Sequence, residues 1–411
     1  MDPFGVRVLV APETSAMALA AVLAGVALGT ISGLTPGLHA NNFALLLAAA
    51  ATSIPGPPEL VGAAMLAAGI VHTFLDVIPA LALGVPDAAM AVTALPGHRL
   101  VLEGRGREAL RLSALGSGLA VVVAVPLAVP LTWAMVRVYP LLRPHLSILL
   151  AAVAVFMIAT EGDRLGRIGA AIAFAASSAL GLVLLDLTFQ GPLPTGDVLA
   201  PLFGGLFGAP VLVDAFRGGG VPPQGDAGLA TDRRTVGLTA SLGTLAGAIV
   251  GYVPGVSSAI AAAVVLGAMP RGGARSFVVA VSGVNTSNAI FGLFALVALG
   301  SPRNGVLVAL NEAGVPLNLP LLLCAVGIAS AVAVVLVPVV GDRYLAAAGR
   351  VDYAKLSVSL LLGLATLSYL FAGVAGVGAF AVASVIGMLP PRFGARRVHL
   401  MGVLMGPLIV G

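Results

Sequence analysis

Polar side chains follow two Pro-Gly pairs that interrupt apolar stretches of the sequence. Proline removes a backbone donor and glycine allows the chain to reverse, so we expect a helix to end at each pair and a short helix to begin after it. The N-terminus of a helix carries unpaired N–H groups and about half a positive charge, which suits an anion. The residues of this expected substrate site are Pro36, Gly37, His39, Asn41 and Asn42 in the first half of the chain, and Pro254, Gly255, Ser257 and Ser258 in the second.

A second set of polar residues lies in or beside apolar runs. Arg303 has the geometry to bind a carboxylate or phosphate through two N–H groups; the alternative is a loop arginine that reaches water. Asp76 lies four residues after His72, so both share a helix face, where a carboxylate either takes up a proton or Na⁺ or makes a structural contact. The expected substrate ligands of this set are Asn285, Thr286, Asn288, Arg303 and Asn304, and the expected ion-coupling residues are His72, Thr73, Asp76 and Asp87.

The composition places these residues in a membrane. Of the 411 residues, 59% are hydrophobic and 9% are charged, and the mean hydropathy is +1.08. A soluble domain has about a quarter of its residues charged. Apolar runs near the roughly 20 residues that cross a bilayer as a helix occur at 16–35, 60–85, 112–136, 168–186, 316–341 and 356–390. Since the short alternating segments of a β-barrel do not occur, we expect an all-α integral membrane protein with many spans.

The basic residues predict the orientation of the chain. The loops 52–59, 187–198 and 311–318 contain no arginine or lysine. The clusters lie at Arg99 to Arg111, Arg164 and Arg167, Arg217 to Arg234, Arg271 and Arg275, Arg343 to Lys355, and Arg392 to Arg397. The positive-inside rule assigns these clusters to the cytoplasm. The net charge of +4 therefore reflects membrane topology and does not indicate nucleic-acid binding. All basic residues but Lys355 are arginine, which is typical of a GC-rich prokaryote, so the cell membrane is the expected location.

The chain contains two copies of one pattern. Residues 25–47 and 243–265 share their glycines and the Pro-Gly pair at a constant offset of 218 positions (Gly243 against Gly25). Further along, VHTFLD at 71–76 is aligned with VNTSNA at 284–289, and Leu83-Gly84 matches Leu299-Gly300. This similarity predicts a duplication. We divide the chain into a first transmembrane repeat (11–216), a cytoplasmic inter-repeat loop (217–236) and a second transmembrane repeat (237–411).

The charges around the two Pro-Gly segments predict that the repeats are inverted. Few charges precede the first segment, and the loop 52–59 that follows it contains no arginine or lysine, whereas arginines flank the second on both sides. Each segment is long enough for one full helix, a break and a helix too short to span. We therefore expect re-entrant hairpins that enter from opposite faces, the architecture of many secondary transporters whose substrate lies near the midplane.

Three stretches carry a resemblance to a known family. GTISGLTPGLHANNFALLL (29–47), residues 84–118 and residues 282–304 are similar to motifs of the large permease subunit of tripartite tricarboxylate transporters. The resemblance implies uptake of a di- or tricarboxylate driven by an ion gradient. It also implies a small membrane subunit and an extracytoplasmic binding protein as partners. We expect membrane lipids and a second copy, in a homodimer, as further contacts.

Two other functions remain open at this point. VPGVSSAI (253–260) resembles the PGVS segment of polyprenyl-phosphate translocases, whose phosphate head group would suit the same helix N-termini. An intramembrane hydrolase using Asp76 or Asp87 is the more remote alternative, because the sequence offers no second catalytic group for it. Motifs for zinc peptidases, nucleotide binding or nucleophilic serine do not occur. The favoured expectation is a transporter and not an enzyme, with alternating access and without a cofactor other than Na⁺ or H⁺ as the coupling ion.

Overall fold

The protein is a bundle of membrane-length helices. The computed structural model describes residues 12–36, 43–44, 47, 56–84, 94–193, 198–215, 221–225, 228–253, 258, 261–262, 265, 273–350 and 352–411. These residues form helices and contain no strand. Eight helical stretches among them are long and apolar enough to cross a bilayer: Pro12–Leu34, Pro58–Leu83, Gly106–Ala159, Arg164–Leu184, Arg233–Tyr252, Ala274–Leu299, Leu319–Ala348 and Ala354–Arg392. The expected polytopic helical membrane protein is confirmed.

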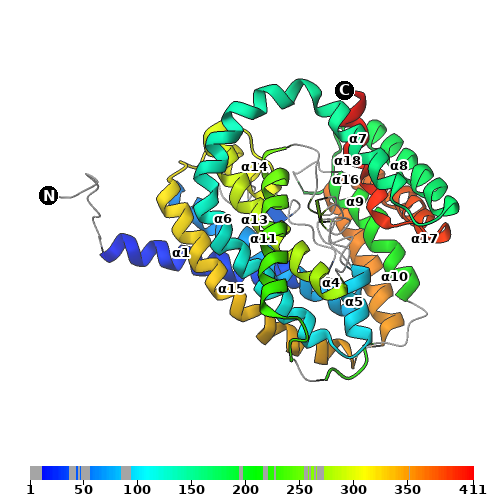
Figure 1. Cartoon of the computed structure of the whole chain (residues 1–411), viewed down its shortest axis with the longest axis horizontal. Helices are drawn as coiled ribbons and strands as arrows, with labels where there is room; N and C mark the ends of the chain where they lie inside the picture. The colour runs from blue at the N-terminus through cyan, green and yellow to red at the C-terminus, as the bar shows by residue number, and fades with distance from the viewer. Residues whose placement is uncertain are drawn as a thin grey trace.

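The helices form two groups, and two of the membrane-length stretches lie at the centre of the first helix group. The first stretch consists of α3 (Pro58–Leu75) and α4 (Val77–Leu83), and the second is α13 (Ala274–Leu299). In both, 94% of the most apolar window is buried, so protein rather than lipid surrounds them. The surrounding helices are α1 (Pro12–Leu34), α5 (Ala94–Leu102), α6 (Gly106–Leu142), α11 (Arg233–Tyr252), α14 (Gly305–Glu312) and α15 (Leu319–Ala348). Figure 1 shows α6, α11, α13, α14 and α15 gathered on the side of the molecule where α1 lies.

Glycines allow the paired helices of each repeat to approach closely. A Cβ atom on Gly25 of α1 would lie 2.2 Å from the carbonyl oxygen of Ala64 in α3, and one on Gly243 of α11 would lie 2.5 Å from that of Ala280 in α13. Helix pairs of this kind are common in membranes because small residues permit backbone contact. The pair α1–α3 and the pair α11–α13 therefore use the same device in both halves.

These contacts correct one detail of the sequence alignment. Gly25 and Gly243 are 218 positions apart, but their contact partners Ala64 and Ala280 are 216 apart. At this offset His72 corresponds to Asn288 and Asp76 corresponds to Gly292, so the alignment of 71–76 with 284–289 was wrong by three positions. That alignment matched identical side chains, whereas backbone contact between helices determines the packing register.

The contact glycines lead to a direct test. We expect Gly243→Ala to destabilise the protein, because the new methyl group would meet the backbone of α13 and force α11 away from it. Gly237→Ala in the same helix is the control, since a Cβ atom at Gly237 meets nothing within 4 Å and alanine favours a helix by up to about 1 kcal/mol. Thermal unfolding in detergent measures both variants. Equal midpoints for the two would contradict the close packing.

Both central stretches end at a glycine with left-handed backbone geometry. The φ angle is 67° at Gly84 after α4 and 62° at Gly300 after α13. Other residues adopt such angles only with strain. The matching pairs Leu83-Gly84 and Leu299-Gly300 of the two repeats are thus both helix ends.

A second helix group contains the remaining elements except η2 (Arg143–His145), the short turn between α6 and α7. They are α7 (Leu146–Ala159), α8 (Arg164–Leu184), α9 (Leu199–Phe203), the π-helical turn η3 (Gly204–Gly208), α10 (Ala209–Ala215), α16 (Tyr353–Gly387), α17 (Leu389–Arg392), η4 (Arg397–Met401) and α18 (Gly402–Val410). They have their own apolar core and lie together on the side of the molecule where the C-terminus ends (Figure 1).

The two halves exchange their last helices within this group. Gly181 of α8 lies against the backbone of Val403 in α18, while Gly205 of η3 lies against the backbone of Phe380 in α16. The end of the second half thus packs on the first half, and the end of the first half packs on the second. The division at 11–216, 217–236 and 237–411 stays a prediction about the duplication, because each half contributes to both helix groups.

Buried glutamates join the arginine clusters of the sequence. Glu108 is fully buried and accepts hydrogen bonds from Arg105 at 2.6 Å, Arg275 at 2.9 Å and the backbone N–H of Ala230 at 2.8 Å. It therefore ties the start of α6 to α13 and to the end of the inter-repeat loop. Arg107 of α6 also lies 3.8 Å from Asp342 of α15. Together with the contacts of Glu108, this places four of the arginine clusters at one end of the first helix group: those around Arg105, Arg234, Arg275 and Arg343.

Glu161 performs the same task in the second helix group. It lies between α7 and α8 and receives hydrogen bonds from Arg396 and from Nε2 of His399, both at 2.7 Å. Burial alone would raise the pKa of Glu161, but these hydrogen bonds outweigh it and hold that pKa below its ordinary value. The carboxylate is therefore charged at neutral pH and fastens η4 to the turn between α7 and α8.

Candidate functional site

A buried carboxylate inside the helix bundle connects the two repeats. Asp76, between α3 and α4, is 4% exposed, and its Oδ2 accepts a hydrogen bond of 2.9 Å from Nδ2 of Asn285 in α13. The same amide lies 3.4 Å from the backbone carbonyl of Thr73. An ionisable group held inside the helix bundle is costly unless it is stabilised by partners, which makes Asp76 a candidate functional residue. The structure thus brings together three of the predicted residues across the repeat boundary.

Asp76 lies where two helices come close. Gly33 of α1 packs against this point, since a Cβ atom on it would lie 3.3 Å from the backbone N of Asp76 and 3.1 Å from the carbonyl oxygen of His72. The backbone N–H of Asp76 donates to that same carbonyl at 2.9 Å, so the helix continues through Asp76 with little distortion. The last turn of α1, just before Pro36, is therefore fixed against the ion-coupling residues expected from the sequence.

His72 has two neighbours that the sequence did not predict. Its Nδ1 lies 2.9 Å from Oγ of Ser32 in α1, and its ring stacks on Phe43, with ring centroids 5.9 Å apart and ring planes 11° apart. Phe43 follows the first Pro-Gly pair, so a residue from beyond this interruption contacts the centre of the bundle. Although His72 and Asp76 share a helix, His72 contacts Ser32 of α1 and Phe43, whereas Asp76 contacts α13.

Ser32 carried a signal that sequence reading could have used. It lies one helical turn before Pro36, between Thr30 and Thr35, and valine, Val250, stands at the matching position of the second repeat. A polar residue present in one repeat and replaced by an apolar one in the other indicates a contact specific to the first. Phe43 offered no such signal, because an aromatic residue in an apolar run is ordinary.

Polar atoms without partners lie further along α13. Oγ1 of Thr286 and Oδ1 of Asn288 are buried and have no hydrogen-bond partner. Most buried polar atoms in folded proteins are paired, so such atoms need an explanation, and a ligand or an ion is one. Both residues belong to the predicted substrate set and lie within one helical turn of Asn285.

Arg303 carries the clearest unused donors of the region. Its Nε and one terminal nitrogen, Nη2, are buried without a hydrogen-bond partner. The guanidinium lies over the ring of Tyr139 in α6, 5.1 Å from the ring centroid, a distance at which a cation and an aromatic ring attract. This contact orients the guanidinium but leaves N–H groups available. Tyr139 is a further residue that the sequence did not predict.

The segment that carries Arg303 folds back along α13. A Cβ atom on Gly292 would lie 3.7 Å from Cβ of Arg303 and 3.6 Å from Nδ2 of Asn304. Gly292 lies seven residues beyond Asn285, which is about 10 Å along a helix. Asn304 caps α14 by accepting the backbone N–H of Leu307 at 3.0 Å, so its side-chain oxygen is already used.

The other predicted site residues fall into two classes. Pro36 forms a half-buried turn at the end of α1, and Ser258 is buried and helical. Gly37, His39, Asn41, Asn42, Asp87, Pro254, Gly255 and Ser257 lie outside the described residues. Within the described part of the chain, no three side chains of histidine, cysteine, aspartate or glutamate are arranged to hold a metal ion.

Comparisons with known proteins give a consistent result. A family model described as the tripartite tricarboxylate transporter TctA family matches residues 19–402. The uncharacterized protein MJ1079 of Methanocaldococcus jannaschii is 26% identical over 404 residues, which cover 95% of this chain and 97% of that protein. No solved structure matches the chain. The family match includes every residue of the site, from Ser32 to Asn304.

Proposed function

The chain belongs to the tripartite tricarboxylate transporter TctA family, and from that premise we propose that it is an ion-coupled, alternating-access permease for a carboxylate anion. It is a multi-pass membrane protein and a component of a transporter, as the family and the eight membrane-length helices among the described residues indicate. We place it in the cell membrane of a prokaryote. A small membrane subunit and an extracytoplasmic binding protein are its proposed partners, and it works as a transporter rather than an enzyme.

The observation that carries the anion proposal is the unpaired guanidinium of Arg303. Two of its nitrogens are buried without a hydrogen-bond partner, and a carboxylate would satisfy both through a bidentate pair. Leaving such donors unpaired costs about 1–3 kcal/mol each, so binding an anion there removes a penalty that the empty site carries. Thr286 and Asn288 would complete the site from α13.

The Asp76–Asn285 contact supports the coupling part of the proposal. The carboxylate lies between the two repeats, so a proton or Na⁺ bound to it changes the charge at their interface. A shift of one repeat against the other would alter this contact first. Asp76 is the proposed coupling residue, with His72 and Thr73 as its neighbours on α3 and Asp87 retained from the sequence prediction.

Transport by the complete complex tests the proposal. The chain is reconstituted in liposomes with its small membrane subunit and binding protein, and an inward Na⁺ or pH gradient is imposed. We expect labelled di- or tricarboxylates to accumulate. Absence of uptake for every carboxylate, together with binding of polyprenyl phosphate, would replace the proposal with the lipid-carrier alternative.

Arg303→Gln tests the anion site itself. We expect the substrate concentration for half-maximal uptake to rise at least about tenfold, because each charge-assisted hydrogen bond contributes about 1.5–3 kcal/mol. Arg137→Gln is the matched control: Arg137 also lies over an aromatic ring, that of Trp133 at 3.7 Å, but on the exposed surface of α6. Equal uptake curves for the two variants would exclude Arg303 from the substrate site.

A further inference from the structure

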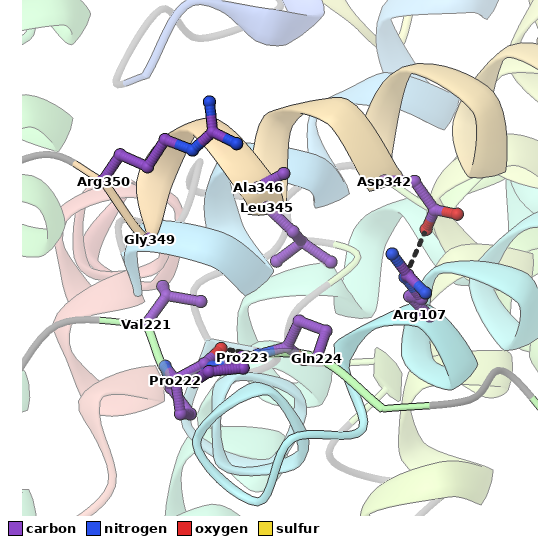
Figure 2. A pocket seen from close by; sticks show the side chains of 10 residues that line it. All are labelled: Arg107, Val221, Pro222, Pro223, Gln224, Asp342, Leu345, Ala346, Gly349 and Arg350. Atoms are coloured by element: carbon purple, nitrogen blue, oxygen red, sulfur yellow. Dashed lines mark hydrogen bonds and ion pairs between the residues drawn. The ribbon is translucent and has the colours of Figure 1, made fainter.

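A cavity of about 260 Å³ lies at the arginine-rich end of the first helix group, away from the transport site. The beginning of α6, the end of α15 and the inter-repeat segment 221–224 form its walls. Figure 2 shows Arg107 and Arg350 at opposite ends of this cavity, with Leu345 between them and Gln224 below.

Hydrogen bonds hold the inter-repeat segment that forms one wall of the cavity. Gln224 accepts the backbone N–H of Gly106 at 2.6 Å and donates to the carbonyl oxygens of Val101 at 3.1 Å and Pro222 at 2.6 Å. The backbone N–H of Gly225 donates to the carbonyl of Gly104 at 2.8 Å. The cavity is therefore formed before any ligand arrives, and the amide of Gln224 is occupied. Recognition of a ligand falls to the two arginines.

The charges of the cavity favour an anion. Arg350 is exposed and has no ion-pair partner among the described residues. Arg107 has one acidic neighbour, Asp342, but its Nε lies 3.8 Å from the carboxylate and both side chains are about two-fifths exposed. Pairs this long and exposed contribute little, so Arg107 can turn to a stronger partner. The three charged side chains leave a net charge of +1 in the cavity.

The size and the surroundings of the cavity indicate the kind of anion. Pockets for whole drug-sized or nucleotide-sized ligands usually exceed about 300 Å³, so this one suits a single phosphate with a small attached group. Val335 and Val339 of α15 are 61% and 45% exposed. They share one helix face with Asp342 and Ala346, which line the cavity. An apolar track on the membrane face of α15 thus leads directly into the basic cavity.

We propose that this cavity binds the phosphate of an anionic phospholipid head group, with the acyl chains along the Val335–Val339 face of α15. Basic pockets at the cytoplasmic ends of membrane helices are suited to such head groups. The bound lipid would connect α6, α15 and the inter-repeat loop. The site is separate from the substrate site and does not rest on the proposed transport function.

Arg350→Gln is the first variant for the test, because Arg350 is exposed and forms no ion pair with another described residue, so we expect the variant to fold. It is examined alone and together with Arg107→Gln. The control is the double variant Arg164→Gln/Arg343→Gln, which removes the same charge from exposed positions that do not line the cavity. Native mass spectrometry counts retained phosphatidylglycerol, and thermal unfolding compares phosphatidylcholine nanodiscs with and without phosphatidylglycerol.

We expect phosphatidylglycerol to raise the unfolding midpoint of the unmodified protein and of the control. The cavity double variant should retain at least about fivefold less of this lipid and lose the shift. Equal retention by the cavity variant and the control would overturn the site. A full shift from inorganic phosphate in pure phosphatidylcholine nanodiscs would assign the cavity to a free phosphate and overturn the lipid.

Discussion

Replacing Asp76 by asparagine is expected to abolish ion-driven accumulation of substrate while leaving the protein folded. Asparagine has nearly the same shape, and its carbonyl oxygen still accepts the hydrogen bond from Asn285. It can neither take up a proton nor supply the charge that holds Na⁺. Coupling between two bound ligands typically changes affinity by about 5- to 150-fold. We therefore expect the accumulation ratio of the variant to be lower than that of the unmodified protein by a factor in this range. Uptake of labelled carboxylate by reconstituted transporter under an imposed gradient measures it.

Asp352→Asn is the matched control for this experiment. It makes the same chemical change at the exposed N-cap of α16, where asparagine caps a helix as well as aspartate does. Exchange of substrate without a gradient should persist in Asp76→Asn, which separates loss of coupling from loss of binding. Unchanged accumulation by Asp76→Asn would reduce Asp76 to a structural contact between the repeats.

Replacing Glu108 by glutamine is expected to cause the largest loss of stability. The change removes the negative charge from a fully buried position and leaves Arg105 and Arg275 without their counter-ion. Breaking a buried ion pair costs about 3–5 kcal/mol. Because the two arginines are 40% and 31% exposed, water can compensate them in part, and we expect about 2–3 kcal/mol. Unfolding in detergent with a chemical denaturant gives the value.

A nearby glutamate provides the comparison for Glu108. Glu103 also pairs with an arginine, Arg99, at 2.9 Å, but both side chains are exposed. Helix-surface pairs of this type contribute about 0.3–0.5 kcal/mol, so Glu103→Gln should change stability only slightly. If both variants lost the same stability, the burial of Glu108 would not be what makes it important.

The fold could be predicted from the sequence where it depends on local composition. Apolar length located six of the eight membrane-length stretches among the described residues, all but α11 and α13, and glycine after leucine located the ends of α4 and α13 at Gly84 and Gly300. The packing register could not be read in the same way. The register depends on which backbones touch. The valine and threonine shared by 71–76 and 284–289 led to an alignment that differs by three positions from the one set by the contacts of Gly25 and Gly243.

The site could be predicted in part, for a related reason. Arg303 and Asp76 stood out because charged groups are rare in apolar runs. Asn285 was also among the predicted residues, but its contact with Asp76 was not predicted, because the two residues lie 209 positions apart and no local pattern indicates such a contact. His399 shows the limit most clearly. No local pattern in the sequence marks this residue, yet it is buried against Glu161, 238 residues away.

The exchange of terminal helices between the halves has a consequence for biosynthesis. Ser177 of α8 donates to the carbonyl of His399 just before α18, 222 residues later. At about 5–20 residues per second, the ribosome needs on the order of 10–40 s to supply that partner after α8 has been made. During this interval the small-residue face of α8 around Gly181 faces lipid or a helper protein. A nascent chain arrested before α18 would therefore present quality-control proteases with an unfinished first half, although every residue of that half has been translated.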